Sequence, residues 1–178
     1  MPDTPEVLAQ RLQTEGQKVL AFFGDLPPDQ WEASVYAEDQ AAELPGKEHA
    51  ELPAGVEEAA GWRVRQVLAH FVSSEASFHQ LIGDILKGGS GAPEDFDIDR
   101  FNRRKVADLA SQTPAELLAQ FAEHRQSTVE LVSCLVQEDL KKTGRHPYLG
   151  VVPLTDTIKM IYRHNQIHLR DLRRVLRS

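Results

Sequence analysis

Three histidines stand where their imidazole rings could bind a single transition-metal ion. His164 and His168 are four positions apart, so on a helix they lie on one face, about 6 Å apart along the axis. His70 falls on an inward stripe of another predicted helix, and it joins the pair if the two helices are neighbours in a bundle. Three nitrogen ligands would leave positions open on the ion. The spacing therefore indicates a metal site formed by His70, His164 and His168.

Each of these histidines also has a purely structural explanation. A histidine on an apolar helix face is usually a core residue whose ring N–H is satisfied by a neighbour. A pair at this spacing can also arise by chance in a chain with seven histidines. The other four histidines fall in predicted loops, face away from His70 or stand among charged residues, and we expect them to be solvated: His49, His79, His124 and His146.

The residues between the paired histidines exclude one large class of metal enzyme. The segment reads His164-Asn-Gln-Ile-His168 and lacks the glutamate that acts as general base in HExxH metalloproteases. The chain also has no glycine-rich phosphate loop, nucleophile elbow or spaced cysteine cluster. Any catalysis is therefore expected to come from the metal, and the spacing assigns no catalytic residue.

Two long amphipathic helices must position the three rings. Their inward stripes recur at steps of three and four residues, as a bundle core requires. The stripe predicted within 62–87 contains Val67, His70, Ser74, Phe78 and Leu81, and the stripe within 155–177 contains Ile158, Ile161, His164 or Asn165, His168, Leu172 and Val175. We therefore expect all three rings to point into the core.

Two further long helices are predicted over 3–26 and 113–137. The first has an Asp3-x-x-Glu6 capping signal, and the second has a capping box at Thr113 and Glu116. The remaining segments are predicted as a long loop over 36–60, a crossover over 95–110 that is helical in its second half, and a short extended hook over 146–153. The predicted fold class is all-α, with four long helices and a long crossover between the second and the third.

Composition limits the kinds of partner. With 178 residues and 41% hydrophobic content, we expect a single domain over 1–178. Asp and Glu number 27 against 20 Lys and Arg, for a net charge of −7, which argues against binding to nucleic acid or anionic membranes. The single cysteine, Cys134, lies among apolar residues and is predicted in the core. No basic-then-apolar leader and no apolar run of membrane-spanning length occurs, so a cytoplasmic location is expected.

Several motifs together resemble the DinB-like family over nearly the whole chain. They are Trp31, the segment Trp62-Arg-Val-Arg-Gln-Val-Leu-Ala-His70-Phe-Val-Ser-Ser-Glu75, Asp99-Arg-Phe-Asn102, His146-Pro-Tyr-Leu-Gly150 and His164-x-x-x-His168. The resemblance implies an up-down-down-up four-helix bundle whose metal triad falls on His70, His164 and His168. The triad that the family implies is thus the one that the helical spacing selects.

The same resemblance carries expectations about chemistry and assembly. It implies zinc, nickel or a similar ion at one end of the bundle, and homodimerisation through helices. Characterised members of the family include thiol-dependent S-transferases and mycothiol-dependent maleylpyruvate isomerases. The sequence departs from a frequent family pattern at Asn165, where an acidic residue often follows the first histidine of the pair. This departure leaves the ligands intact and puts a contact around them in doubt.

These observations leave three functional hypotheses open. The first is a metal-dependent enzyme that transfers a low-molecular-weight thiol, as cosubstrate, to a small electrophile. The second is metal-assisted hydrolysis, for which Glu75 and Asp99 are the nearest candidate general bases in the sequence. The third is a stress-associated metal-binding module without catalytic activity. An open path from solvent to the metal would favour an enzyme, and a closed four-ligand site a structural role.

Overall fold

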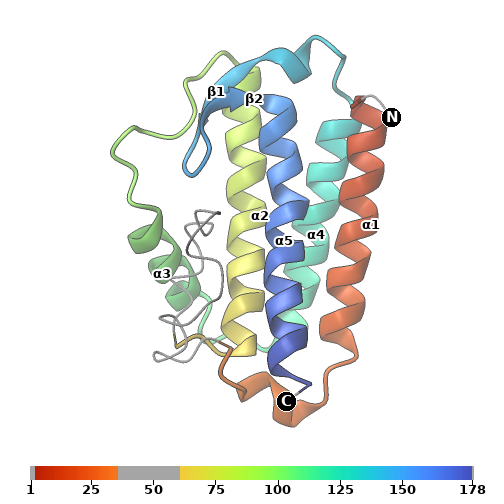
Figure 1. Ribbon diagram of the computed structural model, residues 1–178, viewed down its shortest axis with the longest axis vertical. Coiled ribbons are helices and arrows are strands. Elements are labelled where there is room, and N and C mark those ends of the chain that lie inside the picture. The colour runs from red at the N-terminus through yellow and green to blue at the C-terminus, as the bar shows by residue number, and fades with distance from the viewer. Residues whose placement is uncertain (1–2, 36–60, 178) are drawn as a thin grey trace.

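Four long helices form the body of the protein in the computed structural model, which describes residues 3–35 and 61–177 (Figure 1). They are α1 (Pro5–Gly24), α2 (Val64–Leu86), α4 (Pro114–Ser133) and α5 (Leu154–Val175). α1 and α5 run in one direction, and α2 and α4 run in the other (Figure 1). α1 and α2 each pack against both α4 and α5. The all-α, up-down-down-up four-helix bundle expected from the sequence is confirmed.

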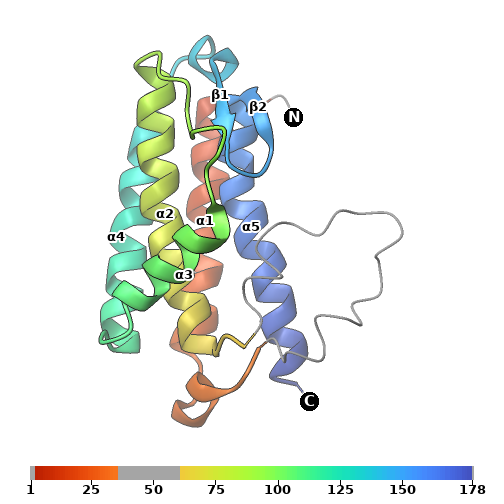
Figure 2. The same cartoon turned by 90° about the vertical axis from the view of Figure 1, so that its left-hand side faces the viewer.

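Because α2 and α4 are parallel, the chain must return along the bundle between them. It does so through α3 (Ile98–Asp108), which packs on the outside of α2 (Figure 2). Asp97 caps this helix by accepting a hydrogen bond from the backbone N–H of Arg100. The predicted crossover is therefore confirmed, whereas the long loop expected over 36–60 lies outside the described residues.

Helix ends follow local capping chemistry, with three differences from expectation. The capping box of Thr113 and Glu116 opens α4 as predicted, but α1 is capped by Thr4 and not by Asp3. α4 ends at Ser133, about four residues earlier than expected. Cys134 is therefore the exposed C-cap, and its predicted place in the core is wrong.

The core of the bundle consists of two apolar clusters with buried polar side chains between them along the helices. The cluster toward the α5 C-terminus includes Phe23, Leu68, Phe71, Phe121 and Leu172, and the cluster toward the α5 N-terminus includes Leu8, Leu12, Ile85, Leu154 and Ile158. The buried polar residues between them include His70, Glu75, Arg125, Asn165 and His168. Such residues are costly in a core unless each finds a partner, so their contacts bear on function.

A hairpin closes the end of the bundle at which α5 begins. β1 (Thr143–His146) pairs antiparallel with β2 (Gly150–Pro153), as expected for the predicted extended hook. The crossover segment joins β1 on its other side, where Ala92 and Ser90 exchange backbone hydrogen bonds of 2.8 Å with Arg145. Gly91 has φ +83, and a Cβ there would lie 2.5 Å from the Arg145 backbone nitrogen, so only glycine permits this approach.

Two short 3₁₀ helices, η1 (Pro28–Glu32) and η3 (Asp139–Lys141), complete the described elements. Among the helices that the structure describes, none combines the length and apolar character needed to cross a lipid bilayer.

Candidate metal centre

The side chains of His70, His164 and His168 meet between α2 and α5; we call them the histidine cluster. The Nε2 atom of His164 lies 2.8 Å from Nε2 of His70 and 3.1 Å from Nε2 of His168. One ligand nitrogen from each ring lies within 4.8 Å of the other two. His70 and His168 are 3% and 2% exposed. The inward direction predicted for these rings is confirmed.

This convergence is difficult to satisfy without a cation. A neutral imidazole carries one N–H, so a single proton on Nε2 of His164 can be aimed well at only one of its two neighbouring nitrogens. The other neighbour then lacks a well-aligned N–H, and if the proton of His164 is on Nδ1 instead, that N–H is buried without a partner among the described residues, so either tautomer is unfavourable. One cation bound by all three Nε2 atoms satisfies the three lone pairs together. The group could therefore hold a metal ion.

Burial prepares the three rings for this role. Desolvation, assisted by the neighbouring rings, lowers the pKa of His70 and of His164 well below the ordinary histidine value. Desolvation also lowers the pKa of His168, to about 4, although the nearby Asp171 carboxylate opposes this shift. All three imidazoles are thus neutral near pH 7, which is the protonation state that binds metals.

The spacing of the three nitrogens suits a small divalent transition-metal ion. Nitrogens held at about 2.0–2.1 Å by a tetrahedral zinc ion lie about 3.3 Å apart, so the observed 2.8 Å and 3.1 Å require only small outward shifts. The Ser74 hydroxyl lies 3.3 Å from Nδ1 of His70 and can accept its N–H. Nδ1 of His164 is buried without a hydrogen-bond partner among the described residues.

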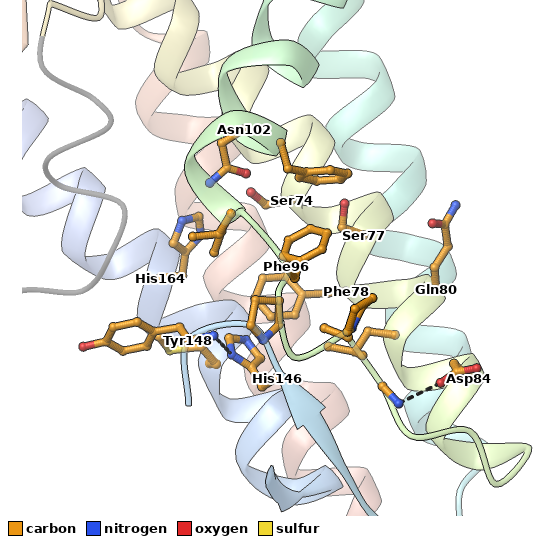
Figure 3. A pocket seen from close by; sticks show the side chains of 18 of the residues that line it. Ser74, Ser77, Phe78, Gln80, Asp84, Phe96, Asn102, His146, Tyr148 and His164 are labelled. Carbon is orange, nitrogen blue, oxygen red and sulfur yellow. Dashed lines mark hydrogen bonds between the residues drawn. The ribbon is translucent and has the colours of Figure 1, made fainter. Parts of the chain in front are cut away.

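A cavity of about 340 Å³ reaches the histidine cluster from the side of the crossover and hairpin. His70 and His164 belong to its wall, and Figure 3 shows His164 facing it together with Ser74 and Asn102. Most of the remaining wall is apolar: Phe78, Leu81, Phe96, Phe101, Tyr148 and Met160. The candidate site is therefore open on one side to a small molecule.

A second group of buried polar residues, which we call the ion-pair cluster, consists of Glu75, Arg125 and Asn165. Arg125 donates to both Glu75 carboxylate oxygens, at 2.8 Å from Nε and 2.7 Å from Nη2. It also donates from Nη2 to Oδ1 of Asn165 at 2.6 Å and from Nη1 to the carbonyl of Leu12 at 2.8 Å. At the position where many family members carry an acidic residue, Asn165 thus accepts a hydrogen bond from Arg125.

The contacts of the ion-pair cluster argue against Glu75 as a general base. Glu75 is 2% exposed and both its oxygens accept from Arg125, so it is unsuited to be the general base that hydrolysis would need. Asp99, the other candidate, lies on α3 and is not part of the cavity wall.

Three of the remaining histidines, which were predicted to be solvated, are buried or half-buried. His146 was expected in solvent but is 4% exposed and lines the cavity; burial lowers its pKa to about 4. His124 is half-buried and contacts the Val72 carbonyl at 3.2 Å, and His79 is also half-buried. His49 lies outside the described residues.

The burial of two important residues was not predicted from the sequence. His146 stands in a turn-rich segment without helical or strand periodicity, and its only signal was its place in the motif His146-Pro-Tyr-Leu-Gly150. Arg125 lies within a charged stretch of α4 and has no local signature of burial, yet it is 4% exposed.

Comparisons with known proteins agree with this description. A family model for the DinB superfamily matches residues 11–172. A crystal structure of an uncharacterised protein from Escherichia coli UTI89 superposes with a TM-score of 0.68 and 16% sequence identity, covering 99% of this chain and 95% of that chain. At this identity the likeness shows the fold alone. No curated protein matches the chain.

Proposed function

The chain belongs to the DinB superfamily, and from this premise we propose that it is a metal-dependent enzyme that transfers a small thiol to an electrophile. His70, His164 and His168 would hold one zinc or nickel ion. The observation that carries the proposal is the convergence of three neutral imidazoles, two of which, His70 and His164, lie at the wall of a cavity large enough for a small molecule.

The charge of the site suits a thiolate. Three neutral imidazoles leave the positive charge of a bound ion uncompensated, and such an ion lowers the pKa of a thiol so that the thiolate form is favoured. The carboxylate of Glu75, which could have neutralised this charge, is instead engaged by Arg125. The apolar wall around Phe78 and Phe96 excludes water and strengthens the attraction between an anionic sulfur and a cation.

Two observations rank the alternatives. Metal-assisted hydrolysis needs a general base near the site, and the two carboxylates considered for it are an ion-paired Glu75 and an Asp99 outside the cavity wall. A purely structural metal would be expected in a closed site with four protein ligands, whereas this cluster offers three ligands beside a cavity.

The test is a thiol titration of the cobalt-substituted protein. Bacillithiol, mycothiol, glutathione and coenzyme A are added one at a time, and the physiological thiol should produce a sulfur-to-cobalt charge-transfer band at concentrations below about 1 mM. The same thiol should react faster with a model electrophile when the protein is present. His164→Ala should remove both effects, and His79→Ala, a histidine on α2 outside the cluster, should keep them.

Failure of this titration would be informative. If none of the four thiols perturbs the cobalt spectrum, the transferase proposal is wrong, and hydrolysis or a binding role takes precedence. If a thiol binds but no electrophile reacts faster, the protein is a thiol-binding metal module and not a transferase.

A further inference from the structure

His146 places an unused hydrogen-bond donor at the wall of the cavity. It is the last residue of β1, it is 4% exposed, and its ring lies 5.5 Å from the ring of Phe78, centroid to centroid. Figure 3 shows it at the cavity next to Tyr148, on the hairpin and thus on a different element from the histidine cluster.

The hydrogen bonds of His146 determine where its proton resides. Nδ1 accepts from the backbone N–H of Tyr148 at 3.0 Å and from that of Leu149 at 3.1 Å. A nitrogen that accepts two N–H groups carries a lone pair and no proton. The single ring proton must therefore be on Nε2. The backbone of the hairpin turn thus fixes both the tautomer and the orientation of the ring.

The Nε2–H group has no acceptor in the part of the chain that the structure describes. Nε2 is buried, and no acceptor among the described residues lies within hydrogen-bond distance of it. Leaving such a donor unpaired in a buried site is unfavourable. A buried polar group that remains unpaired at the wall of a cavity is readily explained when the cavity receives a ligand.

The rest of the wall indicates what kind of ligand this is. Aromatic and aliphatic side chains dominate it. Among its polar side chains, Ser74 bonds the His70 ring, Ser77 donates to the Ser73 carbonyl at 2.8 Å, and Asp84 accepts from the backbone N–H of Gly91 at 3.0 Å. Gln80 and Asn102 also line the cavity. A pocket of this composition favours a mostly apolar molecule that presents an acceptor oxygen at one position.

We propose that the cavity binds an apolar carbonyl compound whose oxygen accepts a hydrogen bond from Nε2–H of His146, so that His146 determines ligand specificity. The inference rests on the proposed function in taking this compound as the electrophile. Binding itself requires no thiol, so the two proposals can fail separately.

The experiment compares two probes that differ by one group, acetophenone and ethylbenzene, in which the carbonyl is replaced by CH₂. Affinities are measured by NMR titration of the zinc-loaded full chain. Two variants separate the functions of the ring. His146→Asn keeps an acceptor at the position of Nδ1 for the two turn N–H groups but lacks a donor that reaches the cavity. His146→Gln keeps a donor near the position of Nε2 but lacks the acceptor.

His146→Asn should weaken acetophenone binding about 5- to 10-fold, as expected for one hydrogen bond, and should change ethylbenzene binding less than about twofold. His146→Gln should retain most of the ketone affinity. In the wild type, the His146 Nε2–H resonance should shift on adding acetophenone but not ethylbenzene. This last measurement tests the inference even if both variants fold poorly.

Three results would overturn the inference. One is an equal loss of affinity for both probes in His146→Asn, which would show that His146 has only a structural role. Another is unchanged ketone affinity in that variant. The third is a wild-type ring protonated at Nδ1. Any of these, together with a charge-transfer band from a thiol, would reject the inference and leave the proposed transferase standing. Ketone selectivity without any thiol effect would support the inference and reject the proposed transferase.

Discussion

Two polar clusters lie side by side in the core of this bundle, and neighbouring residues of α5 belong to different ones. His164 is part of the histidine cluster, and Asn165 is part of the ion-pair cluster. In the ion-pair cluster each of the three guanidinium nitrogens of Arg125 donates to at least one acceptor, and the positive and negative charges cancel. In the histidine cluster three ring nitrogens face one another, and two of the rings, those of His70 and His164, line the cavity.

The two clusters show how a structural polar core can be distinguished from a binding site. Burial alone does not separate them, since Glu75 and His168 are each 2% exposed. What separates them is whether the protein itself completes their interactions. The ion-pair cluster is complete and should respond to mutation through stability, whereas the histidine cluster needs a cation and should respond through metal content.

The largest expected effect is loss of the metal. The purified wild type should contain close to one transition-metal ion per chain, and His168→Ala should contain almost none, because two imidazoles make a poor site. Metal analysis by mass spectrometry gives the stoichiometry. Both the variant and the chelated wild type should keep their far-ultraviolet helical signal, because the two apolar clusters do not depend on the ion.

Two controls accompany this measurement. His79→Ala should retain the ion, since its ring is outside the cluster, and His70→Leu should lose the ion yet stay helical, since an apolar side chain of similar size can fill the inward position. Full metal occupancy in His168→Ala would refute the triad. Collapse of the helical signal on chelation would show that the ion is structural.

Disrupting the ion-pair cluster should lower the stability of the protein and leave its metal content unchanged. Glu75→Gln leaves the Arg125 guanidinium, 4% exposed, without its carboxylate, and this should lower the free energy of unfolding by about 3–5 kcal/mol. Urea unfolding near pH 7 measures the loss. Metal stoichiometry should stay at one ion per chain.

The matched double variant Glu75→Leu with Arg125→Met should recover most of that stability, because apolar replacements remove both charges together. If Glu75→Gln instead released the metal while its stability remained unchanged, the division between the two clusters would be wrong.

Acid should weaken the histidine cluster in the metal-free protein. The pKa of His168 is about 4 in the folded chain and near 6.5 when unfolded, so the unfolded chain binds more protons between these values. The stability that depends on the neutral ring is fully present above pH 6.5 and is lost as pH falls through 4. Near pH 5 the loss from His168 alone should be about 2 kcal/mol relative to pH 7.5.

Urea unfolding of the chelated protein at these two pH values checks the sign and size. His168→Leu is the matched comparison and should lose less stability on acidification than the wild type. Equal losses in the two proteins would mean that His168 is not held neutral by burial.

The smallest expected effect concerns the space around Arg125. An alanine Cβ at Gly16 in α1 would lie 2.8 Å from Cγ of Arg125, too close to the stem of a buried side chain to be relieved cheaply. Gly16→Ala should therefore destabilise the protein by about 1–2 kcal/mol. Gly83→Ala in α2 meets no atom within 4 Å and should instead stabilise it by up to about 1 kcal/mol. Thermal unfolding of both variants tests this contrast; equal shifts would show that Arg125 tolerates the added methyl group.

Local sequence patterns located the long helices and placed three histidines on inward stripes. Periodicity and capping depend on residues within one or two turns, so α2, α4 and α5 could be located, with their ends accurate to a few residues. The spacing of His164 and His168 on one stripe of α5 is a local property of the same kind. His70 could be predicted because it lies on the inward stripe of α2, and its side chain is buried in the structure.

Which polar groups have partners depends on the tertiary structure. Glu75 and Arg125 are 50 positions apart, and no local pattern in either segment predicts their contact. His146 is buried because the hairpin folds over the cavity, and Cys134 is exposed because α4 ends one residue before it. Partners of this kind are set by which helices pack together and how loops close over them. Those contacts join residues distant in sequence, so local patterns carry no information about them.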